Sequence, residues 1–278
     1  MSIFNEPKID CHNHIFDPVR FPYRPDTHYR PSGQECGSAR LFMQVLDAYG
    51  VRHALVVGPN SGYDTDNRCL LDAIAQSGGR FKGIAVVENY CSLETVSALQ
   101  TQGIVGVAFN PAFLGVAYYT GTALLLKMLS QLGMLLQVQV EKDQLPNLMP
   151  LLDGSDVRLL IDHCGRPEPR DGLSNRAFQA LLALGRSGRA WVKLSGLSKF
   201  SHEAHPHADT WPFIEALVQA FTLDRCVWGS DWPYLRAPER VEYGPQLKLI
   251  ERLFPNAVDR NKLLWETPRQ LLGWASDT

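Results

Sequence analysis

Eight short apolar runs, rich in β-branched residues, recur along the chain and constrain its fold more than any other feature. The runs cover 8–14, 53–59, 81–87, 104–110, 135–140, 157–164, 190–196 and 226–233. Longer amphipathic stretches separate them, and several of these stretches end at a glycine, as the C-cap of a helix does. The alternation indicates repeated units of one strand followed by one helix.

Eight such units in 278 residues fit a (β/α)8 TIM barrel, which is an α/β fold. A doubly wound nucleotide-binding sheet more often has fewer strands and a glycine-rich phosphate turn after the first one, and no GxGxxG follows the first run here. The chain also has no internal repeat and no linker-like change in composition. We therefore expect a single barrel domain spanning residues 1–278.

The charge balance argues for a small-molecule partner. The chain has 27 Lys and Arg against 29 Asp and Glu, a formal net charge of -2, and no basic block that would favour nucleic acid or an anionic membrane surface. Residues 1–10 lack an apolar signal-like segment, no stretch approaches the roughly 18 apolar residues of a membrane span, and the six cysteines form no CxxC. We expect a cytoplasmic protein with reduced thiols, and a homo-oligomer is possible.

The run "KIDCHNH" places His12 and His14 one residue apart. Alternate side chains of a strand share a face, so a strand here would point both imidazoles the same way. His163 ends the sixth run in "IDHCGRP", and Asp231 ends the eighth in "WGSDWP". Because barrel enzymes build their active sites at the carboxyl ends of the strands, we expect these four side chains to converge there.

Three imidazoles and a carboxylate are compatible with two kinds of chemistry. They can bind one divalent metal such as zinc, or they can transfer protons and polarise a carbonyl without a metal. Each motif alone also fits a purely structural histidine. The occurrence of all four residues at matching strand ends favours a functional site.

These residues resemble the pattern of the amidohydrolase superfamily, and most closely its 2-pyrone-4,6-dicarboxylate hydrolase-like lactonases. The matching segments are "DCHNHIFDPVRFPYRPDTHYRP", "GPNSGYDTDNRCLLDAIA", "IDHCGRP", "WVKLSG" and "RCVWGSDWP", which span nearly the whole chain. The resemblance implies a (β/α)8 barrel that opens the lactone ester of a small carboxylic acid in aromatic catabolism.

Two departures from the family pattern refine this expectation. Fuller superfamily sites bridge two metals with a lysine or glutamate on strand four or five, whereas this chain has "VAFN" and "LQVQV" there, so we expect no binuclear centre. The pyrone branch often carries an arginine where this chain has Ala108. The candidates for binding an anionic lactone are then the cations Arg166 and Lys199, with the loop hydroxyls of Tyr29 and Ser61.

The resemblance implies a mechanism in which Asp231 is the general base. His12, His14 and His163 would polarise the lactone carbonyl, either directly or through one zinc ion. Because the pyrone branch works without metal, we expect no required cofactor. The alternative is one Zn²⁺ held by His12, His14, His163 and Asp231.

Three functions from different classes follow from these alternatives: a metal-independent lactonase, a zinc-dependent sugar lactonase or decarboxylase, and a non-catalytic acid-binding barrel. The intact Asp231 disfavours the acid-binding barrel.

Two further residues are open to a second interpretation. Lys193 in "WVKLSG" could be a Schiff-base lysine, and Cys164 could be a nucleophile, although we expect a buried structural thiol.

Overall fold

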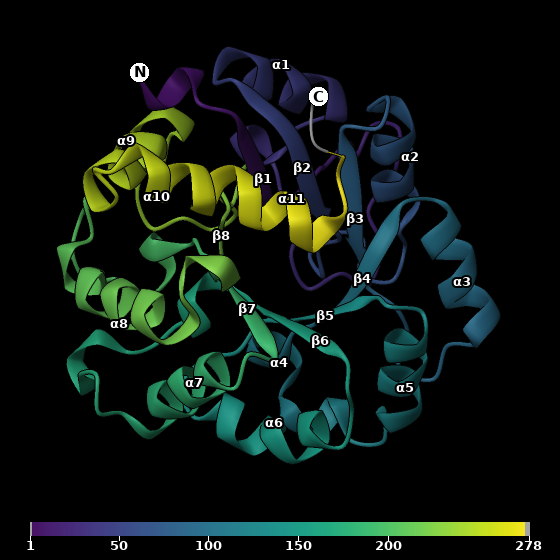
Figure 1. The fold of residues 1–278 in the computed structure, drawn as a ribbon. Coiled ribbons are helices and arrows are strands. Elements are labelled where there is room, and N and C mark those ends of the chain that lie inside the picture. The colour runs from purple at the N-terminus through teal and green to yellow at the C-terminus, as the bar shows by residue number, and fades with distance from the viewer. Residues whose placement is uncertain (1, 276–278) are drawn as a thin grey trace.

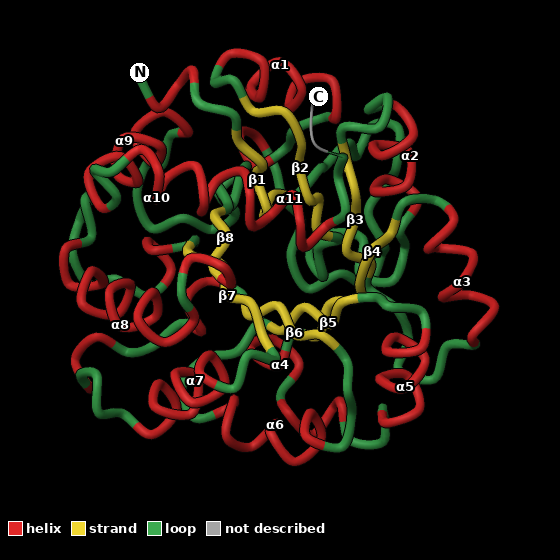
Figure 2. Tube along the Cα trace, viewed as in Figure 1, coloured by secondary structure: helices red, strands yellow, loops and turns green. Residues whose placement is uncertain are grey.

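The computed structural model describes residues 2–275 and confirms the predicted (β/α)8 barrel. Within these residues, eight parallel strands pair in chain order and curl around a common axis, with helices outside them (Figures 1 and 2). The strands are β1 (Lys8–Asn13), β2 (Val51–Val57), β3 (Phe81–Ala85), β4 (Ile104–Phe109), β5 (Leu135–Val138), β6 (Arg158–Ile161), β7 (Ala190–Leu194) and β8 (Cys226–Trp228).

The helices lie outside the strands and are amphipathic. They are α1 (Ala39–Ala48), α2 (Arg68–Gln76), α3 (Leu93–Thr101), α4 (Pro111–Leu114), α5 (Ala123–Gln131), α6 (Gln144–Asp153), α7 (Arg176–Arg186), α8 (Trp211–Phe221), α9 (Tyr243–Leu253), α10 (Ala257–Asn261) and α11 (Thr267–Leu272). Serine side chains cap α1 and α3, where Ser38 accepts from the Leu41 amide and Ser92 from the Thr95 amide. None of the described helices has the length and apolarity needed to cross a membrane.

Every predicted run overlaps a strand; β2 begins two residues before its run, at Val51, and several other strands are shorter than predicted. The eighth run, 226–233, contributes only Cys226–Trp228 as strand. The chain turns directly afterwards, and Asp231 has a φ of 61°, which no extended strand accommodates. The sixth run similarly stops at Ile161, because His163 and Cys164 adopt positive φ in a short 3-10 turn. The predicted site residues therefore lie on turns after these strands.

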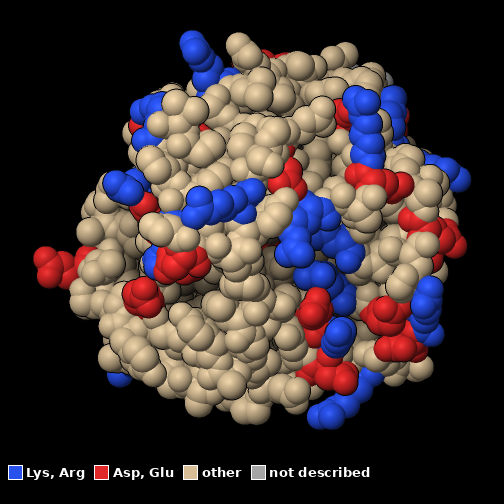
Figure 3. Space-filling model, turned by 180° about the vertical axis from the view of Figure 1, so that it is seen from behind, with Lys and Arg blue, Asp and Glu red and all other residues tan. Residues whose placement is uncertain are grey.

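The barrel is filled at one end and open to ligands at the other. Interior residues such as Ile9, Leu55 and Leu160 form a buried cluster with Leu271, Leu272 and Trp274 from the C-terminal part of the chain. Helix α11 crosses this end in Figure 1, so the amino ends of the strands are covered. The opposite face, seen in Figure 3, has a hollow near its middle with lysine and arginine side chains beside it.

The barrel closes between β1 and β8 at the level of the predicted site. An isolated bridge joins Asn13 to Trp232, the Asp231 amide donates to the His12 carbonyl (2.7 Å), and the His14 amide donates to the Trp232 carbonyl (2.8 Å). The buried Asp10 carboxylate accepts from the amide and hydroxyl of Ser230 at 2.9 and 2.6 Å. This closing seam therefore holds the Asp231 loop against β1.

Candidate active site

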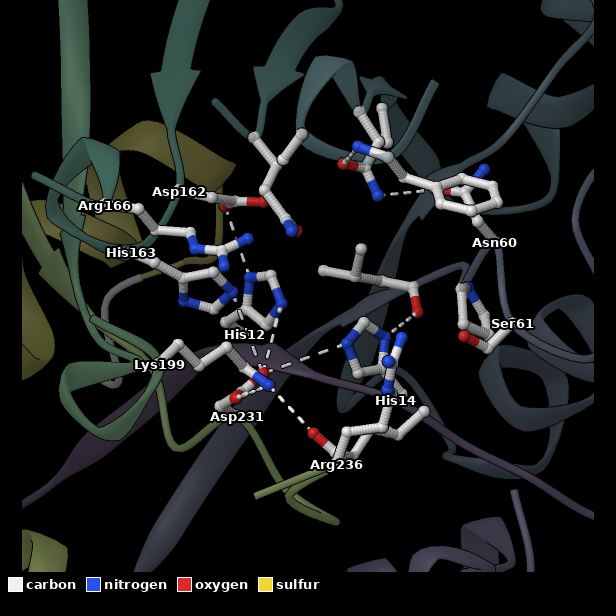
Figure 4. Close-up of a pocket in the computed structure, with 18 of the residues that line it drawn as sticks. His12, His14, Asn60, Ser61, Asp162, His163, Arg166, Lys199, Asp231 and Arg236 are labelled. Carbon is white, nitrogen blue, oxygen red and sulfur yellow. Dashed lines mark hydrogen bonds and ion pairs between the residues drawn. The ribbon is translucent and has the colours of Figure 1, made fainter. Parts of the chain in front are cut away.

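A cavity of about 470 Å³ opens at the carboxyl ends of the strands. His12, His14, His163 and Asp231 all line it (Figure 4). The Nε2 atoms of the three histidines lie 3.7, 4.0 and 3.8 Å, respectively, from the same oxygen, Oδ1 of Asp231. These separations are too long for hydrogen bonds. The four atoms therefore surround a common space in which a ligand can contact all of them.

An irregularity in β1 directs His12 into this space. The pairing of β1 with β2 shifts register between Asp10 and Asn13. Cys11 already belongs to the interior cluster, so a regular strand would turn the next residue, His12, outward. The shift instead keeps His12 facing inward, a use of bulges common beside active sites. The prediction that His12 and His14 share a face is confirmed, although the strand is not regular.

The hydrogen bonds of His14 and His163 determine what each can offer a ligand. His14 Nδ1 lies 2.8 Å from the Val57 carbonyl, which can only accept, so Nδ1 carries the proton and neutral His14 presents a lone pair at Nε2. His163 Nδ1 contacts the Ser195 hydroxyl at 3.0 Å, and a hydroxyl can donate or accept. Neutral His14 can therefore accept a proton but cannot donate a hydrogen bond to a carbonyl, whereas His163 can do either.

A buried polar network lies beneath His12. Lys193 Nζ is 2.5 Å from Gln137 Oε1, 3.0 Å from Asp162 Oδ1 and 3.0 Å from His12 Nδ1. The Gln137 amide donates to the other Asp162 oxygen at 2.8 Å, and Asp162 Oδ1 lies 3.3 Å from His12 Nδ1. All four side chains are at most 2 % exposed. We call His12, Gln137, Asp162 and Lys193 the floor of the site.

Burial and charge determine the protonation of the cluster. Burial lowers the pKa of His12, and the nearby positive charge of Lys193 lowers it further. Burial also lowers the pKa values of His14 and His163. For Asp231, burial alone would raise the pKa, but Lys199 and the neighbouring histidines lower it below its ordinary value. At neutral pH the site therefore combines neutral imidazoles with an ionised carboxylate.

The predicted substrate-binding residues have different environments. Lys199 Nζ lies 3.0 Å from Asp231 Oδ2 and donates to the Leu235 carbonyl at 3.0 Å. Arg166 lines the cavity and pairs with Glu141 at 3.1 Å, and Ser61 also lines the cavity.

Tyr29 is the predicted binding residue that does not line this cavity. Its hydroxyl donates to Glu35 at 2.5 Å, and the guanidinium of Arg236, which does line the cavity, lies over its ring at 5.3 Å. Tyr29 therefore supports the site through Arg236.

Comparison with known proteins identifies the family. The Amidohydrolase family model matches residues 9–274. The chain belongs to this family. A 4-sulfomuconolactone hydrolase of Rhizobium radiobacter is 30% identical over 273 residues, covering 95% of this chain and 89% of that protein. A 2-pyrone-4,6-dicarboxylate hydrolase of Comamonas testosteroni is 28% identical over 277 residues, covering 95% and 89%.

Among solved structures, a probable 2-pyrone-4,6-dicarboxylic acid hydrolase from Acinetobacter baumannii, solved with citric acid bound, superimposes with a TM-score of 0.86. It is 25% identical to this chain, and the match covers 96% of this chain and 99% of that one. The resemblance to the pyrone dicarboxylate hydrolases is therefore confirmed by both sequence and fold.

Several residues that line the site of this amidohydrolase were not among the sequence candidates. One wall carries amides: Asn110 donates to Asn60 at 2.9 Å, and Gln139 lies beside them in the lining. Asp162 and Gln137 had usable signals, since Asp162 directly precedes His163 and Gln137 alternates with apolar residues in "LQVQV". Arg236 had no signal, because it lies on an irregular loop after β8.

The alternative roles of Cys164 and Lys193 can be examined directly. Cys164 is fully buried, its thiol points at the Lys193 carbonyl at 3.7 Å, and burial raises its pKa to about 12. The expectation of a buried structural thiol is confirmed, and Cys164 lies in a left-handed turn after β6 with a φ of 57°. Lys193 lies under His12 and does not line the cavity, which disfavours a Schiff base with substrate.

The residue types of His12, His14, His163 and Asp231 are those of a site for one metal ion. Imidazole nitrogens and a carboxylate oxygen are suitable zinc ligands, and His12, His14 and Asp231 place one ligand atom each within 4.8 Å of one another. His14 and Asp231 fit, because each directs a lone pair into the cavity. His12 is the exception: a metal-binding Nε2 requires the proton on Nδ1, and Nδ1 lies closer to Lys193 Nζ, at 3.0 Å, than to the acceptor Asp162 Oδ1, at 3.3 Å.

Proposed function

We propose that this amidohydrolase opens the lactone ester of a small anionic acid by general-base hydrolysis. The observation that carries the proposal is the convergence of three imidazole Nε2 atoms on one oxygen of the ionised Asp231, inside a cavity that Arg166, Lys199 and Arg236 also line. The names of its relatives support it, since a sulfomuconolactone and a pyrone dicarboxylate are both anionic cyclic esters.

Asp231 and His14 are suited to orient the attacking water. Their facing atoms, Oδ1 and Nε2, are 4.0 Å apart, and both accept hydrogen bonds. A water molecule between them donates one proton to each and turns a lone pair toward the substrate. Asp231 then takes one proton as the water oxygen bonds to the lactone carbonyl carbon.

The negative charge on the carbonyl oxygen of the tetrahedral intermediate needs hydrogen-bond donors. The His12 and His163 rings lie side by side, with centroids 4.4 Å apart, and can present N–H groups to this oxygen, while neutral His14 cannot. The intermediate collapses with cleavage of the ring C–O bond, and Asp231 returns its proton to the leaving oxygen. The product is the ring-opened hydroxy or enol acid, which loses its carboxylic proton to solvent.

The anionic group of the substrate is expected to bind at Arg166, and Lys199 and Arg236 add positive charge nearby. A guanidinium can bind a carboxylate through two hydrogen bonds. The Ser61 hydroxyl and the amides of Asn110 and Gln139 remain for uncharged oxygens of the ligand. Substrate would thus lie with its charge toward Arg166 and its ester over Asp231.

Zinc-dependent lactone hydrolysis or decarboxylation is the second candidate, favoured by the residue types around Asp231. His12, His14, His163 and Asp231 would hold the ion, which would supply Lewis-acid polarisation of the substrate. Activity after exhaustive chelation, with and without added zinc, separates the two candidates. We expect activity to survive chelation.

A panel of lactones tests the proposed reaction. Each carboxylated lactone is paired with its neutral methyl ester or amide, and alkali uptake at constant pH reports ring opening. We expect turnover of at least one carboxylated member, with much lower kcat/KM for its neutral partner. Absence of catalysis across both sets would contradict the lactonase proposal and leave decarboxylation or an acid-binding barrel.

A further inference from the structure

Lys193 is fully buried, and its Nζ lies 3.0 Å from Asp162 Oδ1, yet no step of the proposed reaction uses it. Burial lowers the pKa of Lys193, while the adjacent Asp162 carboxylate opposes that shift. Its Nζ has three acceptor atoms within hydrogen-bond distance: Oε1 of Gln137, Oδ1 of Asp162 and Nδ1 of His12. An ammonium group has three protons and no acceptor site. Each of the three protons of Lys193 therefore has one acceptor, and one of these acceptors is the ring nitrogen Nδ1 of His12.

The orientation of the Gln137 amide is fixed by its neighbours. Its Nε2 donates to Asp162 Oδ2 at 2.8 Å, which turns its oxygen toward Lys193. Asp162 then has both oxygens engaged, Oδ2 by Gln137 and Oδ1 by Lys193. His12 Nδ1 lies closer to the Lys193 donor, at 3.0 Å, than to the Asp162 acceptor, at 3.3 Å. Lys193 is therefore better placed to donate a hydrogen bond to His12 Nδ1 than Asp162 is to accept one from it.

We propose that Lys193 holds His12 in the tautomer protonated at Nε2, which makes His12 a hydrogen-bond donor to the reacting carbonyl and keeps a divalent metal out of the histidine cluster. Lys193 is a positioning residue in this account, because it acts through His12.

The surroundings of His12 Nε2 agree with this tautomer. The atom is buried, has no hydrogen-bond partner within the described structure, and faces the cavity beside Asp231 at 3.7 Å. Figure 4 shows the ring lying between Asp162 on one side and Asp231 on the other. An N–H in this position is ready to bond a developing oxyanion. It also removes the lone pair that a metal ion would need.

The proposal deepens the lactone hydrolysis proposed above but is tested on the resting enzyme, so the two can fail separately. The full-length protein labelled with ¹⁵N in histidine reports which ring nitrogen carries the proton, and a His12→Asn sample identifies the His12 signals. We expect His12 protonated at Nε2 and His14 protonated at Nδ1, an internal reference fixed by the Val57 carbonyl. A His12 signal with the proton on Nδ1 would overturn the proposal.

Metal binding provides the second measurement. Lys193→Met removes the donor, so Asp162 can accept from His12 Nδ1 and form the carboxylate–histidine pair typical of zinc sites. We expect zinc affinity, measured against a competing chelator, to rise on the order of 10- to 100-fold over wild type. Lys193→Leu, which also lacks a donor, is prepared in parallel should Lys193→Met fail to fold.

Arg166→Met is the matched control, because it removes a positive charge from the cavity wall, and Arg166 pairs with Glu141 and not with His12 or Asp231. We expect its zinc affinity to remain near the wild-type value. An equal gain in both variants would show that only the total charge matters and would contradict the tautomer proposal. Failure to find any lactone substrate would withdraw the role of His12 toward the carbonyl, while the tautomer and zinc results would still stand.

Discussion

The floor of the cavity and its rim are built in different ways. The floor side chains, His12, Gln137, Asp162 and Lys193, come from strands or the residue directly after one, are at most 2 % exposed, and bond to one another. We define the rim as His28, Asn60, Ser61, Arg166 and Arg236, which lie on loops and are partly or fully exposed. A rim side chain is held by one or two contacts, such as the single ion pair of Arg166.

This difference suggests that the floor supports catalysis and that the rim determines which substrate binds. Side chains fixed by a buried network keep their geometry before substrate arrives, which is what transition-state stabilisation requires. Side chains on exposed loops can change between related proteins without disturbing that geometry. We therefore expect changes next to the floor to reduce kcat, and changes at the rim to alter KM and substrate choice.

The largest effect is expected from Asp231→Asn, which removes the base while retaining the side chain's shape. Loss of a general base typically costs 10²–10⁴-fold in rate. We expect kcat to fall by about that factor, measured on whichever lactone the panel identifies, while circular dichroism shows an unchanged fold. A variant with near wild-type kcat would exclude Asp231 as the base.

Gly196→Ala tests whether the exact placement of His163 matters. Gly196 has a φ of 61°, and a Cβ at this position would lie 2.4 Å from His163 Nδ1, so the imidazole must move. A misplacement of about 1 Å near the reacting atoms can cost on the order of 10²-fold in rate. Gly172→Ala is the control, since Gly172 has a φ of 69° and open space around it. We expect kcat to fall only in Gly196→Ala; equal losses would indicate backbone strain alone.

The sequence alone was enough to predict which residues at the strand ends come together. A (β/α)8 barrel brings the carboxyl ends of β1, β6 and β8 to one face, so His12, His163 and Asp231 could be placed together from chain order alone. The argument from strand alternation was less secure, because the register shift between Asp10 and Asn13 is invisible in the sequence. Without this shift, alternation from the inward-facing Cys11 would turn His12 outward.

The floor network could not be predicted in the same way. Whether Lys193 meets a substrate, a metal or His12 depends on the neighbours that β5 and β6 place across the barrel, namely Gln137 and Asp162. Loop residues were harder still. Tyr29 was predicted near substrate, but its hydroxyl bonds to Glu35, a contact set by the folding of two irregular segments.

At the rim, Arg166→Met is expected to raise KM for carboxylated lactones on the order of 10- to 100-fold, because a charge-assisted hydrogen bond is lost. KM for neutral partners should change little, and kcat should be largely retained. Steady-state kinetics on the paired panel gives both constants. A proportional loss on both sets would mean that Arg166 supports its loop and does not bind the ligand.

Arg166→Met also leaves Glu141 unpaired, and that carboxylate would repel an anionic substrate. The double variant Arg166→Met with Glu141→Gln removes the repulsion. If KM for the carboxylated lactones returns to the wild-type value, Arg166 acts only by neutralising Glu141. If KM stays raised, Arg166 binds the substrate directly.

The smallest effect at neutral pH is expected from Lys199→Met, which tests the contact between Lys199 in the cavity wall and the catalytic carboxylate of Asp231. Lys199 lies 3.0 Å from Asp231 Oδ2 and opposes the effect of burial, so that the pKa of Asp231 is below its ordinary value of 3.8. Without Lys199, burial dominates and the pKa of Asp231 rises. The base must be ionised to act, so the acid limb of the kcat profile should move to higher pH, with kcat reduced below about pH 5 and nearly unchanged above pH 7. Arg166→Met, which does not contact Asp231, should leave the limb in place. An unshifted limb in Lys199→Met would show that Lys199 does not control the ionisation of Asp231.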